Sequence, residues 1–303
     1  MKRRFHQLDV FSAVPLLGNP LAVVHDAAGL SDATMAAFAR WTNLSETTFL
    51  LPPTAAAAGG AELAARADYR VRIFTPGGEL PFAGHPTLGS CHAWLAAGGV
   101  PRDAGVVIQE CAVGLVRVRR GPGAGAGAGV GAGAGSPRLA FAAPPLRRSG
   151  PLSADLVAQI TQALALPAAA VLQHQWVDNG PGWCALLLDS AQRVLDVRPD
   201  FAALGDLKLG LVGAHPAGSE TQFELRALIG DGAYEDPVTG SLNASVAQWL
   251  IGAGIAPDRY VAAQGAALQR AGRVFIERDG EGAGSTIWVG GDVAVCIDGE
   301  VTL

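Results

Sequence analysis

The chain has 303 residues, of which 50% are apolar and 16% are charged, and its net charge is −5. This length allows a large core and favours two domains. The acidic balance argues against nucleic-acid binding, which usually requires a basic face, and no apolar run approaches the roughly 20 residues of a membrane-spanning helix.

The basic residues at 2–4 are followed by an apolar stretch that Gln7 and Asp9 interrupt, and no small-residue cleavage site follows. We therefore expect a first strand over 5–11 rather than a signal peptide. The four cysteines are widely spaced and form no CxxC pair. This usage predicts free thiols in a reducing cytoplasm and no zinc or other metal site.

The first half of the chain alternates helices and strands. Ser31 is a favourable N-cap for a helix over 32–43. Runs rich in β-branched and aromatic residues, bounded by proline and glycine, predict strands over 47–51, 69–74, 106–109 and 115–119.

A low-complexity tract follows, in which glycine occupies every odd position from 121 to 135. A dinucleotide-binding GxGxxG motif needs glycines at offsets of two and five, and an offset of five falls on an even position, so this tract excludes it. The tract predicts a flexible linker at a domain boundary.

The second half repeats this organisation. Ser153 is the expected cap of a helix over 154–164. Further strands are predicted over 185–188, 222–228, 273–277, 286–289 and 293–297. The expected class is α+β, with an N-terminal domain over 1–120, a linker over 121–136 and a C-terminal domain over 137–295. A C-terminal strand near 296–303 is expected to return to the first domain.

Two segments about half a chain apart share one pattern. Gly84 and Gly240 each begin an apolar helix that has a Trp-Leu pair near its end, Trp94-Leu95 and Trp249-Leu250. A helix that is apolar nearly all round is buried. Its first amide groups have no partner within the helix, and the helix dipole places partial positive charge there. Two such starts facing each other would bind an anionic substrate, most simply a carboxylate.

Several polar residues lie beside these helix starts or at a predicted junction. Glu46 is placed between a helix and a strand, where partial burial would raise its pKa towards that of a useful general acid or base; the alternative is a surface glutamate in a loop. His85 is expected to be neutral because the helix dipole disfavours the imidazolium, although it could serve only as a cap. Asp236 could cap the second helix or bind a substrate amine or hydroxyl. Ser241 is a candidate donor, but it lies in no GxSxG elbow.

Together these segments resemble the PhzF family of phenazine biosynthesis-like proteins. The matching segments occur in the family's order in both halves, at 9–11, 18–23, 43–49, 74–76, 79–87 and 235–241. The resemblance implies the fold of diaminopimelate epimerase. In that fold, two similar domains each wrap a β-barrel-like sheet around a central helix, and the active site lies between them.

The resemblance also implies the chemistry. The family's catalytic carboxylate falls on Glu46, and its substrate-binding residues fall on Gly84, His85, Asp236, Gly240 and Ser241. The implied reaction is a cofactor-free isomerisation, in which Glu46 takes a proton from one carbon of an unsaturated small carboxylic acid and returns it to another. The phenazine-pathway member acts on a dihydro-hydroxyanthranilate, and a homodimer is expected on the same ground.

Two alternatives remain on this scaffold. In diaminopimelate epimerase and proline racemase, a cysteine precedes each helix-start glycine, and the two thiols exchange the proton; here those positions hold Ala83 and Thr239, and Cys91 lies two turns further along. A racemase or epimerase of that type is therefore disfavoured. A non-catalytic protein that binds small carboxylates stays open, and Trp183 is expected to alter the pocket and with it the substrate.

Overall fold

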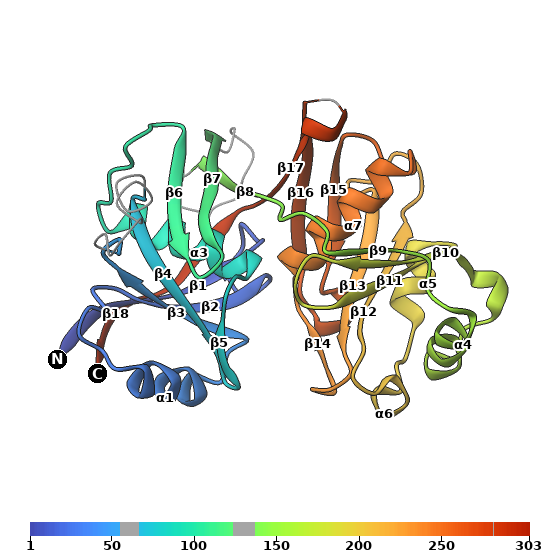
Figure 1. The fold of residues 1–303 in the computed structure, drawn as a ribbon, viewed down its shortest axis with the longest axis horizontal. Coiled ribbons are helices and arrows are strands. Elements are labelled where there is room, and N and C mark those ends of the chain that lie inside the picture. The colour runs from blue at the N-terminus through green and yellow to red at the C-terminus, as the bar shows by residue number, and fades with distance from the viewer. Residues whose placement is uncertain (55–66, 124–136, 281) are drawn as a thin grey trace. The chain divides into compact units, whose positions relative to one another are not determined.

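The computed structural model describes residues 1–54, 67–123, 137–280 and 282–303. They divide into two compact units, the first made of 1–142 and 290–303 and the second of 143–289 (Figure 1). Most of the tract expected to be a linker, 124–136, falls outside the described residues.

The described residues of the first unit form a sheet and two helices. Its helices are α1 (Asp32–Thr42) and α3 (Gly84–Ala96). Its strands are β1 (Lys2–Val10), β2 (Asn19–Val24), β3 (Glu46–Leu51), β4 (Tyr69–Thr75), β5 (Gly78–Leu80), β6 (Val106–Cys111), β7 (Gly114–Gly123), β8 (Pro137–Ala142) and β18 (Val293–Thr302).

The strands of this unit curve around α3. The pairing is antiparallel for β18–β1, β1–β2, β3–β4, β6–β7 and β7–β8, and parallel for β2–β3 and β4–β6. Helix α3 contacts strands from both ends of this series, including β2, β3, β8 and β18, and Figure 1 shows it enclosed by them. Because most of its side chains are apolar or small, the helix is buried over nearly its whole length.

Helix α1 lies outside this sheet and fixes the approach to β3. The Ser31 hydroxyl accepts a hydrogen bond from Thr34 N at 3.1 Å, as expected for an N-cap. The helix ends at Thr42, and its C-cap residue Asn43 has φ 53° in the left-handed region. Phe38 then packs edge-on against Phe49 of β3. The short turn between these elements places Glu46 at the first position of β3.

The second unit repeats the arrangement with more helices. Its strands are β9 (Arg148–Gly150), β10 (Val171–Asp178), β11 (Trp183–Leu188), β12 (Lys208–Ala214), β13 (Phe223–Ile229), β14 (Tyr234–Asp236), β15 (Arg259–Gln264), β16 (Gly272–Asp279) and β17 (Thr286–Gly291). Its helices are α4 (Ala154–Ala163), α5 (Ala191–Asp196), α6 (Phe201–Leu204) and α7 (Gly240–Gly252). Short 3-10 turns occupy η1 (Ala168–Ala170), η2 (Ala266–Leu268) and η3 (Gly282–Gly284).

Helix α7 is the buried helix of this unit. It packs against β10 and β16, and ten of its residues, among them Leu242, Val246 and Leu250, are buried. Strand β12 passes close to the helix at Gly210, where an added Cβ would lie 2.5 Å from a methyl carbon of Leu242. A side chain at position 210 would therefore displace the end of the Leu242 side chain, so the close approach favours glycine here.

The structure adds strands that the sequence did not predict, chiefly β2, β10, β12 and β15. Strand β12 contains two glycines, which ordinarily weaken a strand, and β2 contains Pro20. Their pairing is decided by burial against α3 and α7, which a local pattern does not encode. Strand β8, which the sequence placed in the C-terminal domain, pairs with β7 inside the first unit.

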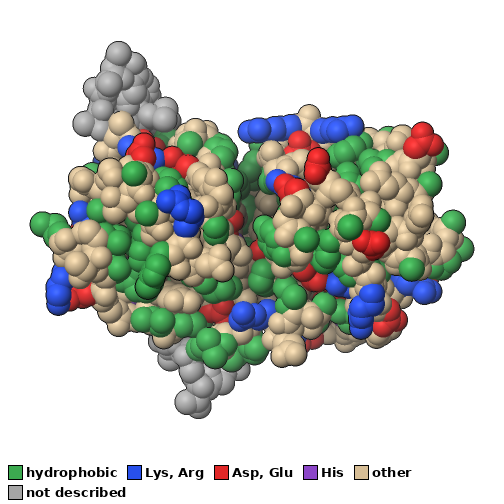
Figure 2. Space-filling view, turned by 90° about the horizontal axis from the view of Figure 1, so that it is seen from below, with side chains coloured by type: hydrophobic (Ala, Val, Ile, Leu, Met, Phe, Trp, Pro, Cys, Tyr) green, Lys and Arg blue, Asp and Glu red, His purple; other side chains and the backbone are tan. Residues whose placement is uncertain are grey.

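Within the described ranges, no helix is long and apolar enough to cross a membrane. On the face drawn in Figure 2, Lys and Arg side chains lie among Asp and Glu side chains. That face therefore presents no extended basic surface of the kind that nucleic-acid binding uses.

A chain of polar side chains, whose two histidines are buried, joins β1, β18 and the end of β2 in the first unit. His6 Nε2 lies 3.1 Å from the carboxylate of Asp298, and His6 Nδ1 lies 3.0 Å from His25 Nε2. Because a carboxylate only accepts, His6 donates to Asp298 and accepts from His25. Both histidines are at most 5% exposed. Burial, and then the charges of His6 and Arg4, lower the pKa of His25 to about 4, despite the opposing effects of Asp26 and Asp298.

This cluster predicts that mild acid destabilises the protein. The folded pKa of His25 lies below its unfolded value of about 6.5, so the unfolded state takes up the proton first as the pH falls. Stability is therefore lost from about pH 6.5 down to about pH 4. His6, His85 and His92 also have lowered pKa values, which adds to the loss.

In urea unfolding at pH 7.5 and pH 4.5, His25→Gln should reduce this pH-dependent loss by up to about 3 kcal/mol. Glutamine can still donate to His6 but does not titrate in this range. An identical pH dependence in the native protein and the variant would show that His25 does not contribute.

Candidate functional site

In the first unit, Glu46 and His85 lie side by side. Glu46 opens β3, and His85 is the second residue of α3. Glu46 Oε2 is 3.2 Å from His85 Nε2, and the two side chains are 14% and 4% exposed. Strand β2 lies beside both residues. Leu21 of β2 is the register partner of Glu46, and the backbone of Pro20 makes a hydrogen bond with the side chain of His85. The structure thus brings together two candidates that the sequence placed on separate elements.

The hydrogen bond to Pro20 assigns the tautomer of His85. Proline has no backbone N–H, so its carbonyl accepts the bond and His85 donates it. Since Nε2 faces Glu46, the donor is Nδ1. Burial lowers the pKa of His85 to about 3, although the bond to Pro20 acts in the opposite direction. The imidazole is therefore neutral at pH 7 because of its burial, whereas the sequence prediction relied on the helix dipole, and Nε2 directs a lone pair towards Glu46.

In the second unit, Asp236, Gly240 and Ser241 lie within one short segment. Asp236 ends β14, and Gly240 begins α7. The carboxylate of Asp236 accepts a hydrogen bond from the hydroxyl of Thr239, the residue before the helix. Asp236 therefore holds the residue that precedes the helix, and the substrate-binding role that the sequence left open for Asp236 stays a prediction.

Gln264 of β15 organises this segment and was not predicted. Its amide oxygen accepts from Thr239 N at 3.0 Å and from Asn243 Nδ2 at 2.8 Å. Its amide nitrogen donates to the backbone oxygen of Asp236 at 3.1 Å and to Thr239 Oγ1 at 2.9 Å. The side chain is 1% exposed. The available signal was a pair of polar residues, Gln264 and Asn243, inside apolar elements.

Both helix starts are as the sequence predicted. Helices α3 and α7 begin at Gly84 and Gly240 and have 13 residues each. Neither N-cap residue, Ala83 or Thr239, supplies a side-chain cap, and neither first turn contains an acidic residue. Each start therefore keeps the polarity that favours an anion.

Three of the four cysteine thiols are poor nucleophiles. Burial raises the pKa values of Cys91 and Cys111, and it raises the pKa of Cys184 to about 12. These three side chains are buried, whereas Cys296 is partly exposed. A thiol reacts as its thiolate, which is scarce at neutral pH for such groups.

Iodoacetamide at pH 7.5 should therefore modify at most Cys296 in the folded protein and leave its activity within about twofold of the untreated sample. Intact-protein mass spectrometry counts the adducts, and the same treatment in urea, where all four cysteines should react, is the control. Rapid inactivation of the folded protein would favour a thiol-dependent racemase instead.

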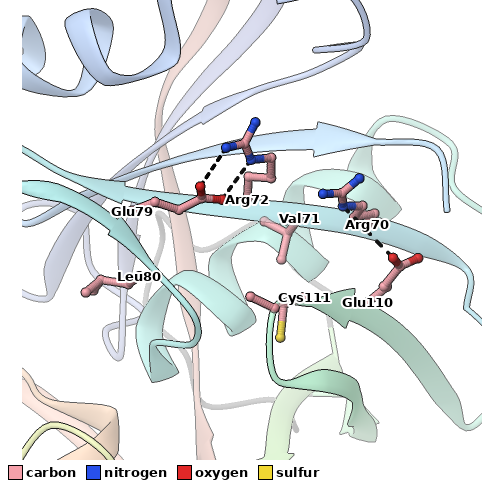
Figure 3. A pocket seen from close by; sticks show the side chains of 8 residues that line it. Arg70, Val71, Arg72, Glu79, Leu80, Glu110 and Cys111 are labelled. Atoms are coloured by element: carbon pink, nitrogen blue, oxygen red, sulfur yellow. Dashed lines mark hydrogen bonds and ion pairs between the residues drawn. The ribbon is translucent and has the colours of Figure 1, made fainter. Parts of the chain in front are cut away.

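One surface pocket of the first unit lies apart from these residues. Its lining includes Arg70 and Arg72 of β4 with Glu79, Glu110 and Cys111 (Figure 3). Arg72 bonds both oxygens of Glu79 at 2.7 and 2.6 Å, and Arg70 pairs with Glu110. Because each arginine faces a carboxylate, the pocket has no net positive charge to attract an anion. No predicted site residue lines it, and we assign it no role.

Comparison with known proteins agrees with this architecture. The family model described as phenazine biosynthesis-like protein matches residues 8–299. Antisense-enhancing sequence 1 of Schizosaccharomyces pombe is 33% identical, over 98% of this chain and 97% of its own length. The trans-2,3-dihydro-3-hydroxyanthranilate isomerase of Pseudomonas aeruginosa is 29% identical, over 99% of each chain.

Among solved structures, a phenazine biosynthesis protein of the PhzF family from Bacillus anthracis superposes with a TM-score of 0.81 over 100% of both chains, at 18% identity. This likeness confirms the expected α+β class and the diaminopimelate epimerase-like fold. With a family match over nearly the whole chain, the protein belongs to the phenazine biosynthesis-like family and is an isomerase of the PhzF type.

Proposed function

We propose that this protein shifts a proton along an unsaturated small carboxylic acid, with Glu46 as the general acid and base. The reaction needs no cofactor in this scheme. The substrate is a small carboxylate, and one candidate is the trans-2,3-dihydro-3-hydroxyanthranilate named for the Pseudomonas aeruginosa relative.

The contact between Glu46 and His85 carries the proposal. With Nδ1 donating to Pro20, a neutral His85 presents an acceptor 3.2 Å from Glu46 Oε2. Two hydrogen-bond acceptors, here a carboxylate oxygen and an imidazole nitrogen, lie this close when they share a proton. The pair is therefore suited to hold one proton between them. Glu46 can give that proton to one carbon of the substrate after taking one from another. His85 stabilises the protonated carboxyl without itself becoming charged.

The helix starts supply the other half of the scheme. Removal of a proton from a carbon next to an unsaturated carboxylic acid leaves negative charge that spreads onto oxygen. Amide groups at Gly84 and Gly240, together with Ser241, would bind the carboxylate and this developing charge, as an oxyanion site does. Asp236 would bind a cationic or hydroxyl group of the substrate.

Two observations argue against a racemase that uses paired thiols. The residues before the helix-start glycines are Ala83 and Thr239, and Thr239 has its hydroxyl engaged by Asp236 and Gln264. Glu46 is a single acid–base group and would act on one face of the substrate. This favours moving a proton along that face over inverting the configuration of a carbon. From the family resemblance we also propose that the protein is a homodimer, which light scattering tests. We further propose that it is cytoplasmic and that its reaction involves no metal ion, nucleic acid or membrane.

Solvent exchange tests the function directly. The protein is incubated in deuterated water with trans-2,3-dihydro-3-hydroxyanthranilate and with a panel of small unsaturated acids, and each acid is followed by mass and by proton NMR. Isomerisation should be accompanied by deuterium at the carbon that receives the proton. Binding of an acid without exchange or isomerisation would instead support the non-catalytic carboxylate-binding alternative.

A further inference from the structure

The loop between β10 and β11 is held by internal hydrogen bonds and lies against the start of α7. Asp178 Oδ1 accepts hydrogen bonds from Gly180 N and Gly182 N, both at 2.7 Å. The two glycines have φ values of 140° and 95°, a region that other residues rarely adopt. The loop therefore has a defined conformation, and it carries Asn179 and Trp183 to the helix.

Trp183 determines how the hydroxyl of Ser241 can bond. The indole Nε1 of Trp183 donates to Ser241 Oγ at 3.0 Å, and Trp183 is 3% exposed. An indole N–H only donates, so Ser241 Oγ is the acceptor in this bond. The hydroxyl proton of Ser241 is then directed to another partner. At the first turn of α7, where the N-cap residue supplies no side-chain cap, this adds an oriented donor to the amide groups that have no partner within the helix.

Asn179 adds an acceptor at the same place. Its Nδ2 donates to the backbone oxygen of Ser241 at 2.9 Å, which fixes the orientation of the amide, because a carbonyl cannot donate. The residue is 6% exposed, and its Oδ1 has no hydrogen-bond partner among the described residues. A buried acceptor without a donor costs about 1–3 kcal/mol, and such groups in native proteins call for an explanation. A ligand donor at the helix start would supply one.

We propose that Trp183 and Asn179 determine which substrate binds at the start of α7. That substrate is a small carboxylate that also carries an N–H or O–H donor. The carboxylate oxygen accepts from Ser241, whose hydroxyl Trp183 orients, and the substrate's amine or hydroxyl donates to Asn179 Oδ1. Trp183 is thus a positioning residue that acts through Ser241. The inference rests on the proposed function in taking Ser241 as a substrate-binding residue, and it narrows the substrate to amino or hydroxy carboxylates.

Binding of two matched probes tests this inference without turnover. Anthranilate has a carboxylate and an amine, whereas benzoate has the carboxylate alone. By calorimetry, the native protein should bind anthranilate about fivefold more tightly than benzoate, the value of one net hydrogen bond. Asn179→Ala should abolish that preference. Equal affinity of the native protein for both probes, or no binding of anthranilate, would overturn the inference.

The role of Trp183 is tested by a double-mutant cycle. Trp183→Phe keeps an aromatic ring but removes the donor, and it should weaken anthranilate binding about fivefold. In a Ser241→Ala background the same change should have an effect below about twofold, because there is no hydroxyl left to orient. Additive effects in the two backgrounds would show that Trp183 acts by packing alone and would overturn its assignment.

Further measurements separate this role from a structural one. Trp249→Phe, at the far end of the same helix, is the matched control and should leave the affinity within about twofold of native. In an ¹⁵N spectrum of the six indole groups, the resonance that is missing in Trp183→Phe identifies the indole of Trp183. Addition of anthranilate should shift this resonance in the native protein but not in Ser241→Ala. Glu46→Gln should bind both probes normally, so a failure of the proposed proton transfer would leave these results unchanged.

Discussion

Glu46→Gln should lower kcat for proton transfer by about a thousandfold, within the range that general acid–base groups contribute. The amide nearly matches the carboxyl group in size and can still donate to His85 Nε2, so the pair should keep its 3.2 Å contact. It cannot take a proton from carbon. KM should change little, because the proposed substrate contacts are made by other residues. The measurement is deuterium incorporation into the acid found to exchange with the native protein.

Two controls make this result interpretable. Glu300→Gln removes another carboxylate from the first unit, one in an exposed ion pair with Lys2, and it should keep native activity. The urea midpoint of Glu46→Gln should also remain close to native, since the change is nearly isosteric. If Glu46→Gln kept full activity, another residue would have to transfer the proton and the role proposed for Glu46 would be wrong.

The sequence predicted the features of this protein that depend on neighbouring residues. The starts of α3 and α7 were predicted at Gly84 and Gly240 because a glycine followed by an apolar, helix-forming run is a local signal. The N-caps at Ser31 and Ser153 were predicted for the same reason, and both hydroxyls accept from the first turn. These predictions are confirmed.

Features that depend on strand pairing were not accessible in the same way. The contact of Glu46 with His85 exists because β2 pairs in parallel with β3 and lies beside α3, and β2 was not predicted. The position of Gln264 depends on the parallel pairing of β15 with β13, in which Leu225 is its register partner. No periodicity near Gln264 indicates that it meets Thr239, 25 residues earlier.

Trp183 is an intermediate case. Its glycine-rich surroundings were visible in the sequence, and an effect on the pocket was expected from them. What the sequence could not supply was the partner, because Ser241 lies 58 residues away on α7. A residue that acts through another is identified only when both atoms of the hydrogen bond are known.

Gln264→Leu should destabilise the second unit by about 3 kcal/mol, because the buried N–H of Thr239 and the half-buried carbonyl of Asp236 lose the partners that Gln264 provides. Leucine fills most of the space, so little of this loss should come from a cavity. Urea unfolding at pH 7.5 measures the change in the free energy of unfolding.

The same substitution should lower kcat/KM by one to two orders of magnitude, about the effect of a small misplacement of binding groups. Thr239 directly precedes Gly240, so the start of α7 and the carboxylate of Asp236 both lose their fixed positions when Gln264 is removed. Gln248→Leu is the matched control. It changes the same residue type on α7, where Gln248 makes one hydrogen bond to the carbonyl of Pro144, and it should cost about 1 kcal/mol and leave kcat/KM near native. Equal losses of activity in both variants would mean that general destabilisation, rather than the position of the helix start, limits the reaction.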